Sequence, residues 1–429
     1  MATDLTWFTV SLNFRLNSFL WKIPLQWDPT RNRFVFKPGG IRTFFWWYFV
    51  MWIVVGVISM GSAVYVIYGQ MYQPKPYISL VSPLQFGTLL PVCGFTLGMG
   101  IIVGMGQAEY NALFLNRILQ LYDDIYQQTA NIGWRQKKGG RSRIKNIFGI
   151  EMPSLVMEDG RLDKFGLTLF VALTPLPFAA TLPSLVMATG IERRDVYKFV
   201  LEDILPFSVS VDSFPIILLR ILLVYVLFAE VYRMIAFLIV VMVIPARLYA
   251  KIVENLMESG SVGSAAGTLP PQIRRFHQIR ILNQEIEKNL ATRIFLLMAI
   301  GLVISTCLNF CAIRFVHSSM ALGIYIMFPF GAFVVLNLIV TLLAVGIRIH
   351  ENSVETLFQW KKGINSFTRE SAQWKKTLGA MQPLKYYVGL NGHNFFDVKK
   401  SLMSTYMVII LEQTIDLLLA LPSVRVLQG

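Results

Sequence analysis

Seven stretches of predominantly apolar residues, separated by more polar segments, dominate the chain. Each stretch is at least about 20 residues long, the length that a helix needs to cross roughly 30 Å of hydrocarbon. The pattern therefore predicts an all-α membrane protein with seven transmembrane helices, near residues 43–68, 81–105, 165–190, 206–246, 293–316, 320–347 and 401–421.

The connections between these stretches alternate in length. Long polar connections occupy residues 106–164, 247–292 and 348–400, and short ones occupy 69–80, 191–205 and 317–319. We expect one membrane domain spanning residues 1–429. Its parts are an N-terminal segment at 1–42, helices one to six with their loops at 43–347, an anchor segment at 348–400 and a last helix at 401–421.

The fourth stretch is too long for one bilayer crossing. A helix over 206–246 would extend roughly 60 Å at about 1.5 Å per residue. Two crossings would leave only a few residues around Ala229–Arg233 for the turn, and would move every later segment to the other side of the membrane. We therefore predict one helix that projects from the membrane, with its apolar run Ile235–Ile244 packed on other protein. This indicates a cytoplasmic helical anchor, with amphipathic helices in 273–292 and near 350–377.

The basic residues predict the orientation. Of the 39 Lys and Arg residues, 31 lie in the N-terminal 42 residues and in 106–164, 247–293 and 348–400. Basic residues accumulate on the cytoplasmic side of membrane proteins. We therefore expect a multi-pass protein of the plasma membrane, with its N-terminus in the cytoplasm and its C-terminus outside the cell.

Composition supports the membrane interpretation. The 429 residues are 55% hydrophobic and 15% charged, and their mean hydropathy is +0.55. A net charge of +14 would suggest nucleic acid if it formed one patch, but the cations here alternate with apolar stretches. Membrane lipid is therefore an expected partner, and nucleic acid is not.

The residues needed for common catalytic or metal sites are missing. The four histidines fall in or beside loops, and there is no His-Glu-x-x-His or Gly-x-Ser-x-Gly motif. Cys307 and Cys311 are four residues apart on a predicted helix, but no His, Asp or Glu accompanies them on that face. We expect neither enzymatic activity nor a bound metal or cofactor.

Charged residues inside the fourth stretch require partners, because charges within a bilayer are costly. Glu230 and Arg233 are three residues apart and so can neutralise each other on one helix face. Arg220 lies in the outer half of the same helix, two turns from Asp212. It either contacts a ligand or holds the bundle together, and the second interpretation is favoured.

Prolines interrupt several of the predicted helices, including Pro91 in the second and Pro215 in the fourth. Proline removes a helix hydrogen bond and kinks the axis. Kinked helices leave cavities, so one interpretation is a ligand pocket in the outer half of the bundle, lined by aromatic residues such as Tyr325 and Phe328. Kinking without a ligand explains the prolines equally well.

The last helix carries Thr405, Glu412 and Asp416. The two acids are four residues apart and face the same way, and neither has a basic residue within reach on its own helix. Identical helices around a shared axis would stack these acids as rings that admit cations. Alternatively, Asp416 lies at the outer interface and Glu412 binds Arg220 or another buried donor.

Thr405-Tyr406, five apolar residues and Glu412-Gln413 resemble the last helix of the insect gustatory and odorant chemoreceptor superfamily. Its gustatory branch has Gln-Phe where this chain has Glu412-Gln413. The segment Trp21–Asp28 is also similar to the N-terminal entry of these receptors.

The resemblance implies a ligand-gated cation channel of four identical or related subunits, opened by a small-molecule tastant or odorant. The permeating cations and the ligand would then be its partners. The alternative is a secondary transporter of a small solute, which would place its site between repeats, and the two halves of this chain show no internal similarity.

Overall fold

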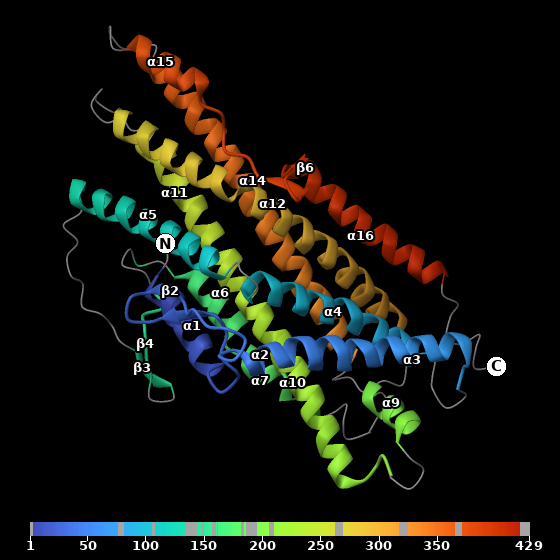
Figure 1. Ribbon diagram of the computed structural model, residues 1–429. Coiled ribbons are helices and arrows are strands. Elements are labelled where there is room, and N and C mark those ends of the chain that lie inside the picture. Colours follow the sequence, from blue (N-terminus) through green and yellow to red (C-terminus); the bar gives the residue numbers. More distant parts are fainter. Residues whose placement is uncertain are drawn as a thin grey trace. The chain divides into compact units, whose positions relative to one another are not determined.

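The computed structural model in Figure 1 describes most of the chain and consists largely of helices. The described residues are 3–75, 81–104, 108–133, 144–147, 150–156, 160, 162–181, 184–185, 195–205, 210–261, 269–316, 325–364 and 371–420. The chain forms two compact units. Unit 1 comprises residues 1–241, 306–332 and 414–429, and unit 2 comprises 242–305 and 333–413.

Five helices in the described part of the chain are long and apolar enough to cross a membrane: Phe45–Tyr72, Phe214–Met257, Asn289–Arg314, Met327–Lys362 and Lys400–Ala420. Two shorter apolar helices, Phe86–Ile102 and Lys164–Ala179, lie in the second and third predicted stretches. Helices thus occur in all seven predicted stretches, and the chain is a multi-pass membrane protein.

The first apolar helix is continuous but changes its winding along its length. It consists of α2 (Phe45–Tyr48), a π-helical segment η1 (Phe49–Met60) and α3 (Gly61–Tyr72). Helix α4 (Val81–Gly104) packs against it and contains Pro91. Proline interrupts the third stretch more strongly, since α6 (Lys164–Leu173) ends just before Pro175, and the short α7 (Leu176–Ala179) follows. Part of the third stretch, including Pro183, lies outside the described residues.

From Phe214 onward the fourth stretch forms one long helix, as its sequence predicts. The predicted start at 206 was too early, because residues 210–213 are not helical, and 206–209 lie outside the described residues. The helix runs through α10 (Phe214–Leu238), the π-helical η2 (Ile239–Val243) and α11 (Ile244–Ser261). Every residue from Ala236 to Leu238 is buried, as are Val240, Val241, Val243 and Ile244. The inner apolar run therefore packs on other protein, which confirms the prediction made for it.

The fifth and sixth stretches extend far beyond their apolar parts. Helix α12 (Leu269–Arg314) has 46 residues and α14 (Met327–Ile364) has 38. The amphipathic segment predicted at 273–292 is thus the first part of α12. The chain has neither Gly nor Pro between Gln272 and Ile300, so nothing in the sequence stops the helix at the edge of the apolar stretch.

The N-terminal segment folds onto unit 1. Helix α1 (Asp4–Leu16) begins at Thr3, whose hydroxyl accepts the Thr6 N–H at 3.2 Å, and it packs against α6 (Figure 1). Strands β1 (Leu25–Asp28) and β2 (Arg33–Phe36) form an antiparallel hairpin. The hairpin packs on α5 (Ala108–Gly133), where the Asn116 side chain bonds both the N–H and the carbonyl of Phe34.

Unit 1 also contains a second hairpin, of β3 (Ile144–Ile147) and β4 (Ile150–Met152), and helix α9 (Val196–Ile204). Helix α9 packs against α3.

Unit 2 is built from α11, most of α12 and α14, α15 (Ser371–Ala380), the hairpin of β5 (Tyr387–Leu390) and β6 (His393–Asp397), and most of α16 (Lys400–Ala420). Phe276 of α12 meets Trp360 of α14 edge to face at 5.8 Å between ring centroids. The Tyr249 hydroxyl of α11 donates to the Ile279 carbonyl of α12 at 3.2 Å. These contacts tie the polar ends of the long helices into one core. That this core is a cytoplasmic anchor stays a prediction.

Candidate functional site

Helix α16 has one packed face and one uncovered face. Leu402, Tyr406 and Ile410, spaced four residues apart, pack in unit 2 against apolar residues of α12 and α14. Thr405 and Glu412 belong to the opposite, exposed face. Large apolar residues share that uncovered face: Val408, Leu411, Ile415 and Leu419 are between 49% and 79% exposed.

Tyr406 fixes the packed face. Its ring is 5% exposed, and its hydroxyl donates a hydrogen bond to the Met298 carbonyl of α12 at 2.9 Å. Gly301 lies beside this contact. A Cβ atom there would collide with the Ile339 side chain of α14 and come within 3.2 Å of the Tyr406 hydroxyl oxygen. Glycine therefore allows the three helices to meet closely.

Glu412 and Asp416 are both exposed, four residues apart on α16. Among the described residues neither carboxylate forms an ion pair. Arg220, which the sequence offered as a partner for Glu412, bonds other carboxylates within unit 1. The two acids stand on a surface that no part of the described single chain neutralises.

Arg220 is almost completely buried, with 1% of its surface exposed. Its Nε donates to Asp195 Oδ2 at 2.5 Å, and its Nη1 lies 3.8 Å from Asp212 Oδ1. Asp195 also caps α9, because its other carboxylate oxygen accepts the Tyr197 N–H at 2.9 Å. The arginine thus joins α9 to α10 within unit 1.

Tyr325 and Phe328 belong to one aromatic cluster in unit 1. Phe328 packs edge to face on Phe315 at 5.5 Å between centroids, and the Tyr325 hydroxyl donates to the Ala312 carbonyl at 3.1 Å. Leu417 and Leu418 of α16 pack against the same cluster. The cluster on which both predicted ligand-binding aromatics lie therefore contacts the end of the helix that carries the acids. In the described part of the chain no hydrogen bond joins either aromatic to Arg220.

Glu230 and Arg233 form the ion pair that their spacing predicts, at 2.6 Å between Nη2 and Oε2. Two indole N–H groups complete the coordination of the Glu230 carboxylate, from Trp21 at 3.0 Å and Trp47 at 3.1 Å. Arg233 Nη1 donates to the Trp21 carbonyl at 2.7 Å, and its guanidinium lies 5.2 Å from the Trp21 ring centroid. The pair is therefore a buried junction between the N-terminal segment and the fourth helix.

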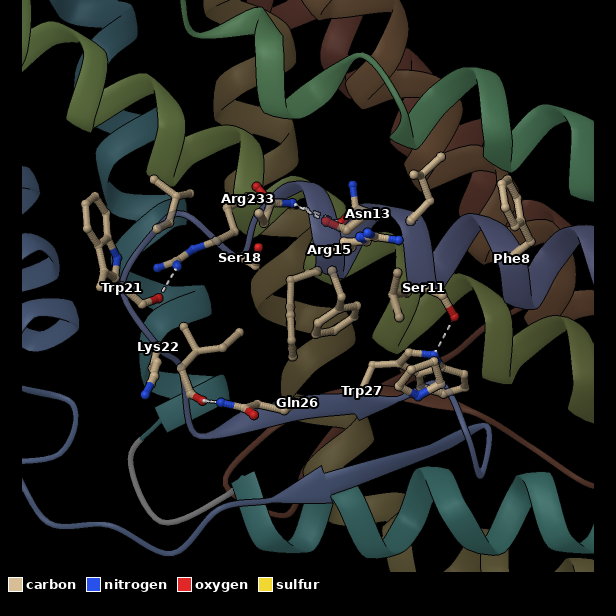
Figure 2. A pocket seen from close by; sticks show the side chains of 18 residues that line it. Phe8, Ser11, Asn13, Arg15, Ser18, Trp21, Lys22, Gln26, Trp27 and Arg233 are labelled. Carbon is tan, nitrogen blue, oxygen red and sulfur yellow. Dashed lines mark hydrogen bonds between the residues drawn. The ribbon is translucent and has the colours of Figure 1, made fainter. Parts of the chain in front are cut away.

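Beside this junction is a pocket of about 570 Å³ (Figure 2). It is lined by α1, the turn that follows, β1 and the inner part of the fourth helix.

Asp28, at the end of β1, lies outside the lining of this pocket. Its carboxylate accepts hydrogen bonds from the Thr30 side chain and N–H, at 2.6 and 2.9 Å. These bonds lower the pKa of Asp28 below its usual value.

Sequence reasoning missed the partners that come from distant segments. Asp195 carried a signal, since an aspartate before a helical run is a typical N-cap. Trp21 and Trp47 carried none that relates them to Glu230, which lies about 200 positions away along the chain. The pocket depends on how the N-terminal segment folds back, and the apolar pattern does not encode that.

No protein-family model and no curated protein matches the chain in sequence. Its structure, however, is similar to that of the insect olfactory receptor OR5 from Machilis hrabei in complex with eugenol. The TM-score is 0.54 at 9% sequence identity, over 97% of this chain and 99% of that chain. The chain has the insect olfactory receptor fold. A second structure of the same receptor matches with a TM-score of 0.47 at 10% identity, over 95% of this chain and 97% of that chain.

The olfactory receptor fold covers 97% of the chain. It confirms the predicted relation to the insect chemoreceptors at the level of the fold.

Proposed function

We propose that the chain is a chemosensory receptor that acts as a ligand-gated cation channel in the plasma membrane. The observation that carries the proposal is the uncovered face of α16, where Glu412 and Asp416 lack a basic partner among the described residues. A membrane helix with such a face requires water or another subunit beside it, because unpaired carboxylates are unstable against lipid. The olfactory receptor fold supports the same conclusion.

Several copies of the chain around one axis would satisfy this requirement. The uncovered faces of α16 would then line a central pore, with Glu412 and Asp416 as two acidic rings about 6 Å apart along the helix. Rings of acidic side chains favour cations, and Thr405 would contribute a ring of hydroxyl groups further along. Following the resemblance to insect chemoreceptors, we propose four subunits, identical or related, held together by the helical core of unit 2.

Gating follows from the contact between the aromatic cluster and α16. A small molecule that inserts beside Tyr325 and Phe328 would displace Leu417 and Leu418, which pack on the same cluster. That displacement would move the end of α16 and so the acidic rings. The OR5 structure was determined in complex with eugenol, and we propose a small odorant or tastant for this chain. Arg220 would hold α9 and α10 in place around the site, with direct ligand contact as the alternative to be tested.

The decisive experiment is a recording of ligand-evoked membrane currents. The chain is expressed in cells without native ligand-gated channels and exposed to a panel of small odorants and tastants. We expect at least one compound to evoke a cation current. This current should reverse at the membrane potential that the cation gradients predict. Accumulation of a solute against its gradient, in reconstituted vesicles that show no current, would contradict the channel and favour a transporter.

A further inference from the structure

The pocket between the N-terminal segment and α10 has no part in the proposed channel. Its volume of about 570 Å³ lies within the usual range of small-molecule sites, roughly 300–1,000 Å³. All of its lining residues belong to unit 1, so its shape is set by contacts within one compact unit. Figure 2 shows side chains from α1, β1 and α10 converging on it.

The charge of the lining is one-sided. Arg15, Lys22 and Arg233 line the pocket, and the described lining residues include neither Asp nor Glu. Glu230 neutralises Arg233 from behind the lining, so the net positive charge of the pocket comes from Arg15 and Lys22. Arg15 and Lys22 are exposed while Arg233 is buried. The two exposed cations therefore stand where the pocket meets solvent, and they disfavour a cationic occupant.

Arg233 adds a second, independent observation. Its two terminal nitrogens bond Glu230 and the Trp21 carbonyl, but its Nε has no partner among the described residues although the side chain is only 6% exposed. A buried donor without an acceptor is destabilising. A ligand that brings acceptor oxygen atoms into the pocket would relieve this cost.

The remaining wall is apolar. Phe14 of α1 packs edge to face on Phe237 of α10 at 6.3 Å between ring centroids, and Leu12 and Val240 extend this surface. We propose that the pocket binds an anionic amphiphile, that is, a phosphate or carboxylate headgroup on an apolar chain. An oxygen atom of the headgroup accepts a hydrogen bond from Arg233 Nε, Arg15 and Lys22 hold its outer side, and the chain lies against the phenylalanines.

Such a ligand would contact both the N-terminal segment and the fourth helix, and would stabilise their packing. Trp21 connects the two regions, since it bonds Glu230 and lines the pocket as well. The proposal does not rest on conduction, and binding can be measured on a chain that carries no current.

The test measures binding of a dodecyl phosphate brominated along its chain, through quenching of tryptophan fluorescence, with the full chain in phosphatidylcholine nanodiscs. Trp21 and Trp27 line the pocket and serve as reporters. We expect Arg15→Gln combined with Lys22→Gln to weaken binding at least about tenfold. The control, Arg31→Gln with Lys37→Gln, removes two exposed charges of the same segment outside the pocket and should leave binding unchanged.

Two further arms identify the source of the ligand. Vesicles of phosphatidylcholine that contain brominated phosphatidylserine test a membrane lipid, and brominated dodecanol tests the chain without its charge. Quenching by phosphatidylserine that the pocket variant loses assigns a lipid headgroup, whereas quenching by dodecyl phosphate alone assigns a soluble amphiphile. Equal binding of the alcohol, equal binding to the pocket variant, or no binding of either anion would overturn the proposal.

Discussion

The hydroxyl group of Tyr406 in α16 donates a hydrogen bond to the main-chain carbonyl of Met298 in α12, at 2.9 Å. This bond, together with Leu402 and Ile410, decides which face of α16 is packed. The face that remains, with Thr405 and Glu412, is the proposed pore surface. Tyr406 therefore sets both the packing of α16 within the chain and the face that α16 would offer to the proposed pore.

Replacing Tyr406 by Phe should leave the ring in place and leave Met298 without this donor. We expect a loss of about 1 kcal/mol in the free energy of unfolding, the typical net value of a hydrogen bond, and altered channel opening. Thermal unfolding of the purified chain and ligand-evoked currents measure the two effects. Tyr68→Phe is the control, because Tyr68 is 61% exposed; an identical shift in both variants would assign no special role to Tyr406.

Replacing Glu412 by Gln should lower the permeability to calcium relative to sodium, because the neutral amide attracts a divalent cation less than a carboxylate does. Asp416→Asn should act in the same direction. Reversal potentials in mixed calcium and sodium solutions provide the measurement. Glu109→Gln makes the same change at an exposed site on α5 and should not alter selectivity. A conducting Glu412→Gln channel with unchanged selectivity would remove Glu412 from the pore.

Replacing Gly301 by Ala should push α12 away from α14, because the new methyl group meets the Ile339 side chain. Overpacking of this kind costs about 1–3 kcal/mol. The double variant with Ile339→Ala should recover part of the loss, and thermal unfolding compares the two. Gly61→Ala in α3 is the control, since nothing lies within 4 Å of its added Cβ. Equal destabilisation by both alanines would point to a general effect of losing glycine.

Replacing Asp195 by Asn should strongly destabilise the chain, because it leaves the charge of Arg220 buried without its closest partner. Breaking a buried ion pair costs about 3–5 kcal/mol. The double variant with Arg220→Gln should be more stable than Asp195→Asn alone, as measured by the yield of folded protein and by thermal unfolding. If Arg220→Gln folds normally but loses its response to ligand, Arg220 contacts the ligand instead.

The proposed orientation predicts where the chain ends lie. An epitope added after Gly429 should be stained by antibody on intact cells, and an epitope before Met1 only after permeabilisation. The physical basis is the concentration of Lys and Arg on the side of the N-terminus. The reverse staining pattern would overturn the orientation and the placing of the long polar connections in the cytoplasm.

Several parts of the candidate site could be predicted because they depend on neighbours along one helix. Glu230 and Arg233 are three residues apart, so the spacing of a helix brings them together wherever that helix lies. The same holds for Glu412 and Asp416 as two acids on one face of α16. By contrast, Asp195 reaches Arg220 across 25 positions, and only the packing of α9 on the bundle brings them into contact.

The sequence by itself determined that this protein is helical, lies in the membrane and has a fourth helix too long for the bilayer. These features depend on local patterns of apolar and charged residues, because the polarity of each segment decides whether it is stable in lipid or in water. The tertiary structure alone decided that Trp21 and Trp47 bond Glu230 and that a pocket forms beside Arg233. It also decided that Tyr406 is packed while Glu412 and Asp416 of α16 are exposed. Such contacts depend on how distant segments pack, and a hydrophobic pattern specifies that a face is buried without specifying what buries it.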